Sequence, residues 1–366
     1  MGRSDRKGFQ IRMKICMIVP DPSVKGGIAS VVNGYRDKDS LLERKYRIKY
    51  VESYRDGSKW QKLGKALCGY GAFFTQLCAN RPDIVHVHSS FGPSFYRKIP
   101  FIYMSALFRV PVINHVHGAE FESFYENASA GKKKLVARVY GKCAKLIVLS
   151  EEWKRRFASF IPEKRIAVLE NYCRLPKEPY DTGRKAEQVL FMGELGKRKG
   201  CYDIPAIWEQ VLRQEPAARL VMAGDGEMEA VRAAFLEKGI SSGVHFPGWV
   251  RNESKEKLFR ESSIFLFPTY HEGMPMAVLE AMGYGLGIVT TDAGGIPKLI
   301  RNEEDGFIGK PGDVQFMARH VIRLLQEPAL CMAYGRRARE LALRDYSAER
   351  HMERLCAIYE AVAGKH

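Results

Sequence analysis

Glu272 and Glu280 are two carboxylates separated by seven residues in the segment HEGMPMAVLE, which follows an apolar, strand-like run. Pro275, between them, suits the first turn of a helix, and Glu280 then falls in the second turn. A carboxylate there accepts hydrogen bonds from sugar or ribose hydroxyls. The backbone N–H groups at the same helix start, preceded by Gly273 and Met274, can bind an anion. The spacing therefore indicates a ligand with both phosphate and hydroxyl groups, such as a nucleotide-diphosphate sugar.

A second candidate segment, GELGKRKG at residues 193–200, follows another strand-like run. Adjacent cations on a glycine-bounded loop are typical of phosphate binding, and Arg198 and Lys199 are the predicted ligands. Glycines also end two later strands, in AGDGE (223–227) and TDAGGIP (291–297). Glycine lacks a Cβ atom, so a ligand can approach the backbone closely there. Several such loops imply a site at the carboxyl edge of a sheet.

These loops need strands and helices to position them. Strand-like runs occur at residues 14–19, 83–87, 112–116 and 146–149, and again at 189–193, 219–223, 244–246, 264–267 and 287–290. Helix-like stretches lie between them, for example at 28–35, 206–214 and 228–237. Strands that alternate with helices imply parallel βαβ units. We therefore expect an α/β fold with two doubly wound halves around a central cleft, joined by a linker at residues 173–188.

Length and charge are consistent with two domains. At about 150 residues per domain, 366 residues suffice for two cores. Residues 1–175 hold 32 Lys and Arg against 15 Asp and Glu, a net charge of +17, whereas residues 176–366 hold 26 against 27, which together recover the total of +16. Positive charge confined to one half suggests an acidic partner for that half, either nucleic acid or an anionic membrane surface.

Other features narrow the class of protein. No run approaches about 18 apolar residues, and residues 1–10 lack the apolar core of a secretion signal, so we expect a cytoplasmic protein. The eight cysteines form no CxxC pair and are expected to be reduced thiols. The sequence has no zinc-ligand spacing and no RNA-binding aromatic motif, so nucleic acid is not an expected partner.

Taken together, the loops resemble those of family 4 of the glycosyltransferases, a retaining family with the two-domain GT-B fold. Glu272 and Glu280 match its E-x7-E motif, and Lys199-Gly200 matches the end of its GRLxxxKG loop. Shorter matches lie at the following segments: Gly26-Gly27, His117-Gly118, GDG (224–226), FPG (246–248) and GGIP (294–297). The resemblance runs from about Lys14 to the carboxy-terminal helix.

The resemblance implies a role for each matched residue. Lys199 neutralises the donor diphosphate, and Gly27 offers its backbone N–H to the same group. Glu280 holds the ribose, Glu272 approaches the hydroxyls of the donor sugar, and His117 faces the donor sugar and the acceptor. His117, Glu272 and Lys199 are thus the expected catalytic residues. No metal or cofactor is expected, because cations and helix termini neutralise the phosphate charge.

The resemblance also implies the domain organisation and the function. Residues 1–175 form a Rossmann-like acceptor domain, residues 176–345 form a Rossmann-like nucleotide-sugar domain, and a terminal helix at 346–366 packs back toward the first domain. The expected activity is transfer of a sugar, from a UDP-linked donor, to a glycan or lipid-linked acceptor in exopolysaccharide, capsule or other cell-envelope synthesis. A nucleotide-sugar epimerase of the same architecture and a non-catalytic sugar-nucleotide-binding protein remain as alternatives.

The sequence departs from the family pattern at three places. Glu194 stands where the family usually has arginine, and Arg198 is the candidate to supply the missing charge. Tyr172 follows Asn171 where the family often has glycine, and Lys298 replaces the usual acid after GGIP. These departures concern details of donor binding, since the strand and loop pattern is otherwise complete.

A basic stretch from Lys132 to Lys145 has apolar residues interleaved at helical spacing. A solvated helix face is one interpretation. The alternative is an amphipathic surface that binds anionic lipid headgroups, extended by Arg97-Lys98 and Arg155-Arg156. On the second interpretation the protein is peripheral at the inner face of the membrane.

Overall fold

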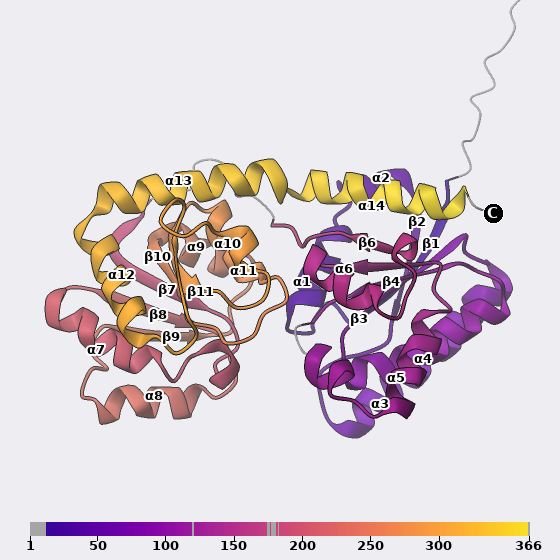
Figure 1. Ribbon diagram of the computed structural model, residues 1–366, viewed down its shortest axis with the longest axis horizontal. Helices are drawn as coiled ribbons and strands as arrows, with labels where there is room; N and C mark the ends of the chain where they lie inside the picture. The colour runs from indigo at the N-terminus through magenta and orange to yellow at the C-terminus, as the bar shows by residue number, and fades with distance from the viewer. Residues whose placement is uncertain (1–11, 119–120, 174–175, 177–180, 182, 365–366) are drawn as a thin grey trace, which may run out of the picture. The chain divides into compact units, whose positions relative to one another are not determined.

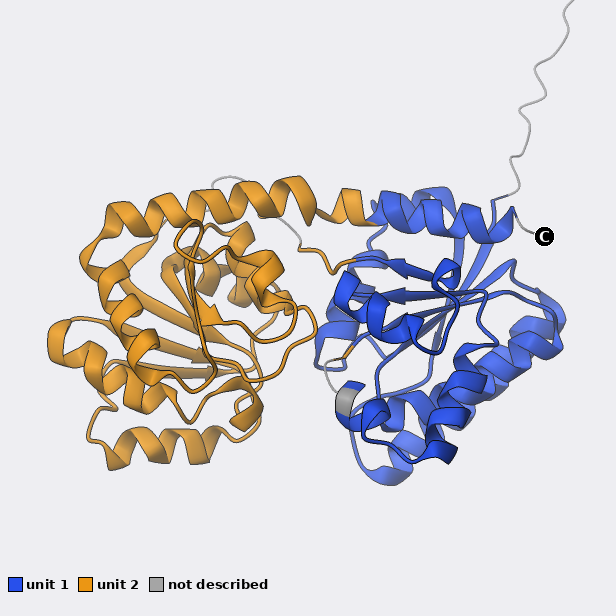
Figure 2. Ribbon diagram, in the orientation of Figure 1, with its two compact units in different colours: residues 1–117, 121–169, 352–366 blue, residues 118–120, 170–351 orange. Residues whose placement is uncertain are grey.

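The computed structural model describes residues 12–118, 121–173, 176, 181 and 183–364. The chain forms two compact units (Figure 2): unit 1 comprises residues 1–117, 121–169 and 352–366, and unit 2 comprises residues 118–120 and 170–351. Each unit contains one six-stranded parallel sheet with helices on both sides (Figure 1). The predicted α/β class with two doubly wound halves is confirmed.

The sheet of unit 1 has the strand order β2-β1-β3-β4-β5-β6. Its strands are β1 (Lys14–Val19), β2 (Arg47–Glu52), β3 (Ile84–Ser89), β4 (Val112–Val116), β5 (Lys145–Val148) and β6 (Ile166–Val168). Its helical segments are α1 (Gly27–Tyr35), α2 (Leu41–Lys45), α3 (Lys59–Ala79), α4 (Pro93–Leu107), η1 (Glu122–Glu126), α5 (Ala130–Tyr140), α6 (Glu151–Ala158) and η2 (Glu163–Arg165). The central strands β3 and β4 are buried on both faces, including the histidines that they carry: His86, His88 and His115.

The sheet of unit 2 has the strand order β12-β11-β10-β7-β8-β9. Its strands are β7 (Lys185–Met192), β8 (Arg219–Ala223), β9 (Val244–Gly248), β10 (Ser262–Phe267), β11 (Gly287–Thr291) and β12 (Phe307–Gly309). Its helical segments are η3 (Lys197–Lys199), α7 (Ile204–Gln214), α8 (Met228–Glu237), α9 (Asn252–Glu261), α10 (Met276–Gly283), α11 (Ile296–Leu299), α12 (Val314–Gln326) and α13 (Pro328–Asp345). The linker was expected at residues 173–188, but β7 already begins at Lys185. The expected linker is therefore too long by four residues.

Each sheet has a point at which the chain reverses its direction of winding. In unit 2, β7 lies between β8 and β10, so the chain first builds outward on one side and then returns to build on the other. In unit 1, β1 lies between β2 and β3 in the same way. Loops diverge at such a switch point and leave a crevice at the carboxyl ends of the strands, where ligands bind in open α/β sheets.

The last helix, α14 (Ala348–Ala363), belongs to unit 1 from Met352 onward. The Tyr359 hydroxyl lies 2.6 Å from Nδ1 of His86 on β3, and Glu360 forms an ion pair of 2.5 Å with Lys45. The helix therefore packs directly on the sheet of unit 1.

In the part of the chain that the structure describes, no helix has both the length and the apolarity needed to cross a bilayer.

Two expectations for the basic residues of unit 1 are wrong. Lys98 is buried, where its ammonium donates to the Ser53 hydroxyl and to the Ile18 carbonyl, so it belongs to no basic surface. Burial lowers the pKa of Lys98 well below its usual range. The basic stretch after Lys132 is also shorter than expected as a helix, because α5 ends at Tyr140 and Lys145 begins β5.

Candidate functional site

Two loops meet at the switch point of unit 2. The first follows β7 and contains the short turn Lys197–Lys199, and the second follows β10 and leads to α10. The Tyr270 backbone N–H donates to the Arg198 carbonyl at 2.9 Å. Gly200 has a φ of +70°, and a Cβ atom there would lie 1.9 Å from the Pro268 carbonyl oxygen. Only glycine lets the loops pack this closely, and residues some 70 positions apart become neighbours.

Lys199 and Glu272 form an ion pair between these two loops. Their side chains are 13% and 7% exposed, so the pair is largely shielded from water. The same Glu272 oxygen accepts a hydrogen bond of 3.1 Å from the Thr269 hydroxyl. Thr269 is itself fixed, since its carbonyl accepts from the Thr291 hydroxyl at 2.5 Å. The arrangement holds one cation and one carboxylate at the crevice, as phosphate and hydroxyl recognition requires.

The GGIP loop packs against the backbone of the loop that carries Glu272. Gly294 has a φ of +57°, and a Cβ atom there would lie 1.8 Å from the Glu272 carbonyl oxygen. The Gly295 backbone N–H donates to the Gly273 carbonyl at 2.9 Å. The sequence analysis expected these glycines to admit a ligand. In the structure these glycines pack closely against the backbone of the Glu272 loop, so they hold that loop in position.

Helix α10 begins at Met276, one residue later than expected, and Pro275 is its N-cap. In the described part of the chain, no side chain caps its first turn, which leaves the backbone N–H groups there to an external acceptor. Glu280 lies in the second turn and forms an ion pair with Lys255 of α9, with side chains 16% and 27% exposed. Lys255 was not predicted, since nothing in the sequence distinguishes it from other lysines on a polar helix.

Asn171 anchors the segment just before α10. Its side-chain amide donates to the Met274 carbonyl at 2.8 Å, and Met274 is buried. The chain has Tyr172 in place of the family's glycine, but Asn171, which matches the pattern, makes this positioning contact. Gly273 and Met274 are held from two sides, by the GGIP loop and by Asn171.

Arg198 lies at the rim of the site. Its guanidinium donates to the Glu194 carboxylate at 3.0 Å and to the His271 carbonyl at 3.4 Å. Glu194, which replaces the family arginine, thus tethers the neighbouring cation instead of adding one. The structure therefore brings Arg198, Lys199, Glu272, Gly273, Met274 and Glu280 to one edge of the unit 2 sheet, as the sequence analysis expected.

The remaining two candidates, Gly27 and His117, belong to unit 1. Gly27 is the first residue of α1, and Gly26 is the N-cap with a φ of +129°. Both glycines are exposed, with nothing within 4 Å of an added Cβ atom. The first turn of α1 contains no acidic residue, so its N–H groups suit an anion.

His117 is buried just after β4. Its Nε2 lies 3.0 Å from Nδ1 of His88, and its ring stacks on His115 at 4.0 Å. His86, His88 and His115 form a buried group whose ligand atoms lie within 4.8 Å of one another. The rings of His86 and His115 are stacked with an angle of 7°, and His86 also contacts Tyr359. This stack is the polar core beneath His117 and fixes its ring at the strand end.

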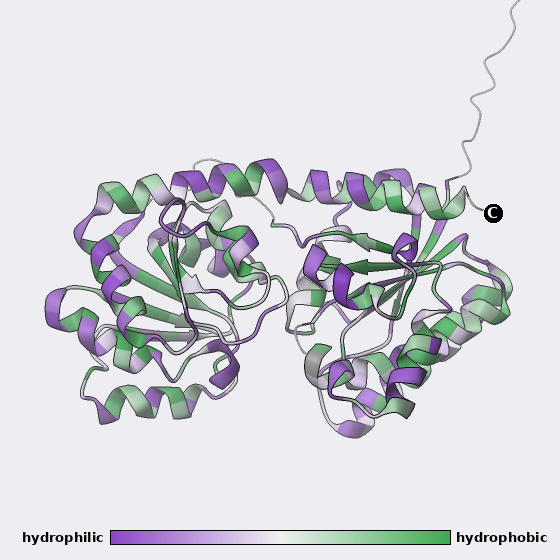
Figure 3. Ribbon diagram, in the orientation of Figure 1, coloured by the Kyte–Doolittle hydropathy of each residue, from purple (hydrophilic) through white to green (hydrophobic). Residues whose placement is uncertain are grey.

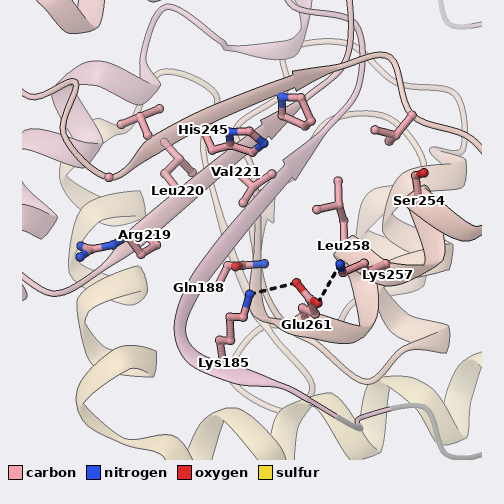
Figure 4. A pocket seen from close by; sticks show the side chains of 14 residues that line it. Lys185, Gln188, Arg219, Leu220, Val221, His245, Ser254, Lys257, Leu258 and Glu261 are labelled. Atoms are coloured by element: carbon pink, nitrogen blue, oxygen red, sulfur yellow. Dashed lines mark hydrogen bonds and ion pairs between the residues drawn. The ribbon is translucent and has the colours of Figure 1, made fainter.

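A hollow of about 520 Å³ lies elsewhere in unit 2 (Figure 4). It is lined by residues at the start of β7 and β8, including Lys185 and Arg219, and by α9. Figure 4 shows Glu261 between Lys185 and Lys257, at 3.0 and 3.8 Å. Strand starts form the amino edge of a parallel sheet, opposite to the loops described above. The hollow is therefore separate from the candidate site, and its one carboxylate, Glu261, is already paired with Lys185 and Lys257.

Comparison with known protein families covers most of the chain. Residues 34–173 match the model described as Glycosyltransferase Family 4, and residues 177–341 match the model described as Glycosyl transferases group 1. The chain belongs to glycosyltransferase family 4. The family models span both units and include every residue of the unit 2 site.

Family 4 relatives share modest identity with the chain. The putative glycosyltransferase EpsD of Bacillus subtilis is 35% identical over 147 residues, which are 40% of this chain and 38% of EpsD. An uncharacterised glycosyltransferase of Haemophilus influenzae is 25% identical, over 58% of this chain and 60% of its own length. The UDP-Gal:alpha-D-GlcNAc-diphosphoundecaprenol alpha-1,3-galactosyltransferase of Escherichia coli is 27% identical, over 71% of this chain and 70% of its own length.

Solved structures share the fold. Sucrose-phosphate synthase of Thermosynechococcus elongatus has a TM-score of 0.80 at 16% identity, over 97% of this chain and 100% of the other. HepE of Anabaena, in complex with UDP and glucose, has a TM-score of 0.73 at 15% identity, over 95% and 100%. At these identities the likeness concerns the fold alone, which is the GT-B architecture that the family 4 motifs predicted.

Proposed function

We propose that the protein is a retaining glycosyltransferase that moves a sugar from a UDP-linked donor to a glycan or lipid-linked acceptor. The observation that carries this proposal is the shielded Lys199–Glu272 ion pair at the switch point of unit 2, beside the start of α10. A diphosphate needs cations and N–H donors, whereas a sugar needs carboxylates that accept from its hydroxyls. Both kinds of group lie on adjoining loops here.

Each residue of the unit 2 site has a proposed task. Lys199 and the N–H groups of α10 bind the donor diphosphate, and Arg198 contributes from the rim. Glu280, held by Lys255, accepts hydrogen bonds from the ribose. Glu272 accepts from the hydroxyls of the donor sugar. The segment of Gly273 and Met274 offers backbone groups to the same sugar.

Unit 1 supplies the other part of the proposed reaction. Gly27 donates its backbone N–H to the diphosphate, and His117 faces the donor sugar and the acceptor. In this proposal unit 1 binds the acceptor and unit 2 binds the nucleotide sugar. Both candidate residues of unit 1 follow the carboxyl ends of parallel strands, where α/β sheets bind ligands.

The chemical problem is the negative charge that develops on the leaving diphosphate. Fixed cations and N–H dipoles stabilise that charge without reorganising, which lowers the barrier. For retention, the acceptor hydroxyl attacks the anomeric carbon from the face that the diphosphate leaves. The C–O bond to phosphate breaks, the new glycosidic bond forms, and the acceptor proton passes to a diphosphate oxygen. The proposal needs neither a protein nucleophile nor a metal ion.

The acceptor class is supported by the relatives' names. The Escherichia coli relative is named for a diphosphoundecaprenol acceptor, and another, AmsK of Erwinia amylovora, for amylovoran biosynthesis. We therefore place the protein in exopolysaccharide, capsule or other cell-envelope glycan synthesis. The net charge of +17 on residues 1–175 supports a location of this protein at an anionic membrane surface, where a lipid-linked acceptor would also lie.

The test is a reaction with a panel of UDP-sugars and a polyprenyl-diphosphate-linked sugar, in chelator and then with magnesium. We expect one donor to be consumed in chelator, with a product whose anomeric configuration by NMR is that of the donor. Inversion would contradict the proposed mechanism. Conversion of a UDP-sugar to its epimer without any acceptor would favour the epimerase alternative, and binding without either reaction would favour the non-catalytic one.

A further inference from the structure

Helix α3 is apolar on both of its faces although one face is exposed. Its inner face contributes Ala66, Gly69, Phe73 and Leu77 to the core. Its outer face carries four large exposed side chains, spaced at three, four and seven residues: Trp60 (81% exposed), Leu63 (50%), Leu67 (58%) and Phe74 (51%). This spacing places all four on one side of the helix. A helix that is apolar all round normally has both sides covered.

Beyond Lys65, the outer face of α3 carries no charge. From Ala66 to Ala79 the helix contains no charged residue, and its other exposed positions include Cys68, Gly71, Ala72, Thr75 and Cys78. An ordinary solvated helix face carries Lys, Glu, Arg or Asp at these positions. Figure 3 shows much of α3 coloured as hydrophobic. The face therefore has the composition of a buried surface.

Helix α4 extends this surface. It packs on α3, where the Tyr70 hydroxyl donates to the Arg97 carbonyl at 3.0 Å and Phe74 contacts Phe108 with ring centroids 5.9 Å apart. Three of its large side chains are exposed: Tyr96 (46%), Tyr103 (38%) and Leu107 (78%). We call these residues, with the four of α3, the α3–α4 face. Seven of the twelve large hydrophobic side chains that are exposed among the described residues belong to it.

Cations frame the α3–α4 face. Between residues 57 and 118 the sequence holds seven Lys and Arg and a single acid, Asp83, but Lys98 is buried and Lys65 is paired with Asp21 and Glu52, so neither adds to the frame. Lys59 and Lys62 lie in the first turn of α3, and Arg81 lies just beyond its end, donating to the carbonyl of Arg109 beyond α4 at 3.0 Å. An exposed tryptophan with tyrosines and flanking lysines is the composition that proteins place at the boundary between lipid headgroups and acyl chains.

We propose that the α3–α4 face docks into the surface of an anionic lipid bilayer, with α3 lying in the membrane plane. Charge complementarity selects this occupant, since cations framing an apolar face attract anionic headgroups. A second copy of the chain would bring two sets of these cations together. The inference does not rest on the proposed transfer reaction, because docking requires neither donor nor acceptor.

The α3–α4 face differs from the basic helix α5 that the sequence suggested. None of the large exposed hydrophobic side chains of the described residues lies on α5. Two of its lysines are also engaged locally, with Lys132 4.2 Å from the ring centroid of Phe124 and Lys133 6.0 Å from that of Tyr125. α5 can add electrostatic attraction, but it offers no apolar side chain for insertion.

The experiment is flotation of the full chain with phosphatidylcholine vesicles that contain about one third phosphatidylglycerol, against vesicles of phosphatidylcholine alone. We expect binding to the anionic vesicles that weakens with salt. The Trp60→Ser/Leu67→Ser variant should lose at least about tenfold in partitioning, because it removes the inserted apolar area. Leu236→Ser is the matched control, since Leu236 is 62% exposed on α8 of unit 2, and it should bind as the wild type does.

Fluorescence locates the inserted face. Tryptophan emission should shift to shorter wavelength with anionic vesicles and be quenched by brominated lipid, and both changes should vanish in Trp60→Phe. Binding lost in Lys134→Glu/Arg138→Glu but kept in Trp60→Ser/Leu67→Ser would overturn the proposal in favour of α5. A dimer in solution that the Trp60→Ser/Leu67→Ser variant abolishes, with no vesicle binding by the wild type, would assign the face to self-association instead. Circular dichroism of each variant checks that it is folded.

Discussion

Replacing Lys199 by methionine removes the ammonium that neutralises Glu272 and keeps most of the apolar length of the side chain. In the structure the Glu272 side chain is 7% exposed, and its remaining donor at the same oxygen is the Thr269 hydroxyl at 3.1 Å. Removing one partner of a buried pair costs about 3–5 kcal/mol, and the partial exposure of Lys199 places our expectation at about 3 kcal/mol. In a unit of this size that corresponds to a Tm lower by roughly 6–12 °C.

The second half of this prediction concerns the double variant. Lys199→Met/Glu272→Gln leaves no unpaired charge, so its free energy of unfolding should return to within about 1 kcal/mol of the wild type. Thermal and denaturant unfolding of both single variants, the double variant and the control Lys197→Met, an exposed neighbour on the same turn, measure the coupling. A double variant as unstable as the sum of the single variants, or a Lys199→Met variant as stable as Lys197→Met, would refute the reasoning.

Three further predictions follow from individual contacts. Gly294→Ala should destabilise the protein by more than about 2 kcal/mol, since its Cβ atom would lie 1.8 Å from the Glu272 carbonyl oxygen. The control Gly239→Ala, at a φ of +69° with open space around it, should cost only the backbone strain of about 1–2 kcal/mol. Equal losses of stability in unfolding experiments would contradict this. Lys255→Met should weaken UDP binding about five- to tenfold in calorimetry by releasing Glu280, and unchanged affinity would contradict its positioning role. Lys98→Met should be at least as stable as the wild type near neutral pH. Burial lowers the pKa of Lys98 in the folded chain, so protonation of this side chain favours the unfolded chain. The stability of the wild type should therefore rise with pH toward the ordinary lysine pKa of about 10.4, so the advantage of Lys98→Met should shrink as the pH is raised. An advantage that grows with pH would contradict the assignment.

Most of the strands that could be identified from the sequence are those that a parallel sheet buries on both faces. β3, β4 and β10 are buried throughout and are rich in apolar residues, whereas β9 was identified although it is a half-buried edge strand. β2 was missed because it alternates exposed and half-buried residues, with Arg47 and Lys49 exposed. β6 and β12 have three residues each, too few to form a pattern. Exposure of the side chains in β2 and short length in β6 and β12 therefore explain these omissions.

The proximity of the candidate site residues was predictable where a residue type at a fixed spacing has a chemical reason. Lys199, Glu272 and Glu280 met that condition, and the structure places them on one edge of the sheet. Lys255 did not, because its importance comes only from the contact with Glu280 across the fold. The reason for Gly294 was also out of reach, since the carbonyl that it approaches lies in a different loop. Contacts between loops distant in sequence depend on topology, which residue patterns encode only indirectly.

The membrane prediction shows a similar limit. The net charge predicted an acidic partner for the first half of the chain, and the lysine run at residues 132–134 suggested α5 as the binding surface. Which apolar side chains stay exposed is decided by packing. The sequence analysis did not single out α3, and only the structure shows that Trp60 and Leu67 remain exposed on it.

The central claim is that the loops at the switch point of unit 2 bind a nucleotide-diphosphate donor without a metal ion. Calorimetric titration of UDP in chelator into wild type, Lys199→Ala and the control Lys197→Ala tests it most directly. We predict binding by the wild type and the control, and a loss of about tenfold or more in Lys199→Ala, because a charge-assisted contact to phosphate is removed. Equal affinity in all three proteins, or no binding by folded wild type of UDP or of any other nucleoside diphosphate, would contradict the account.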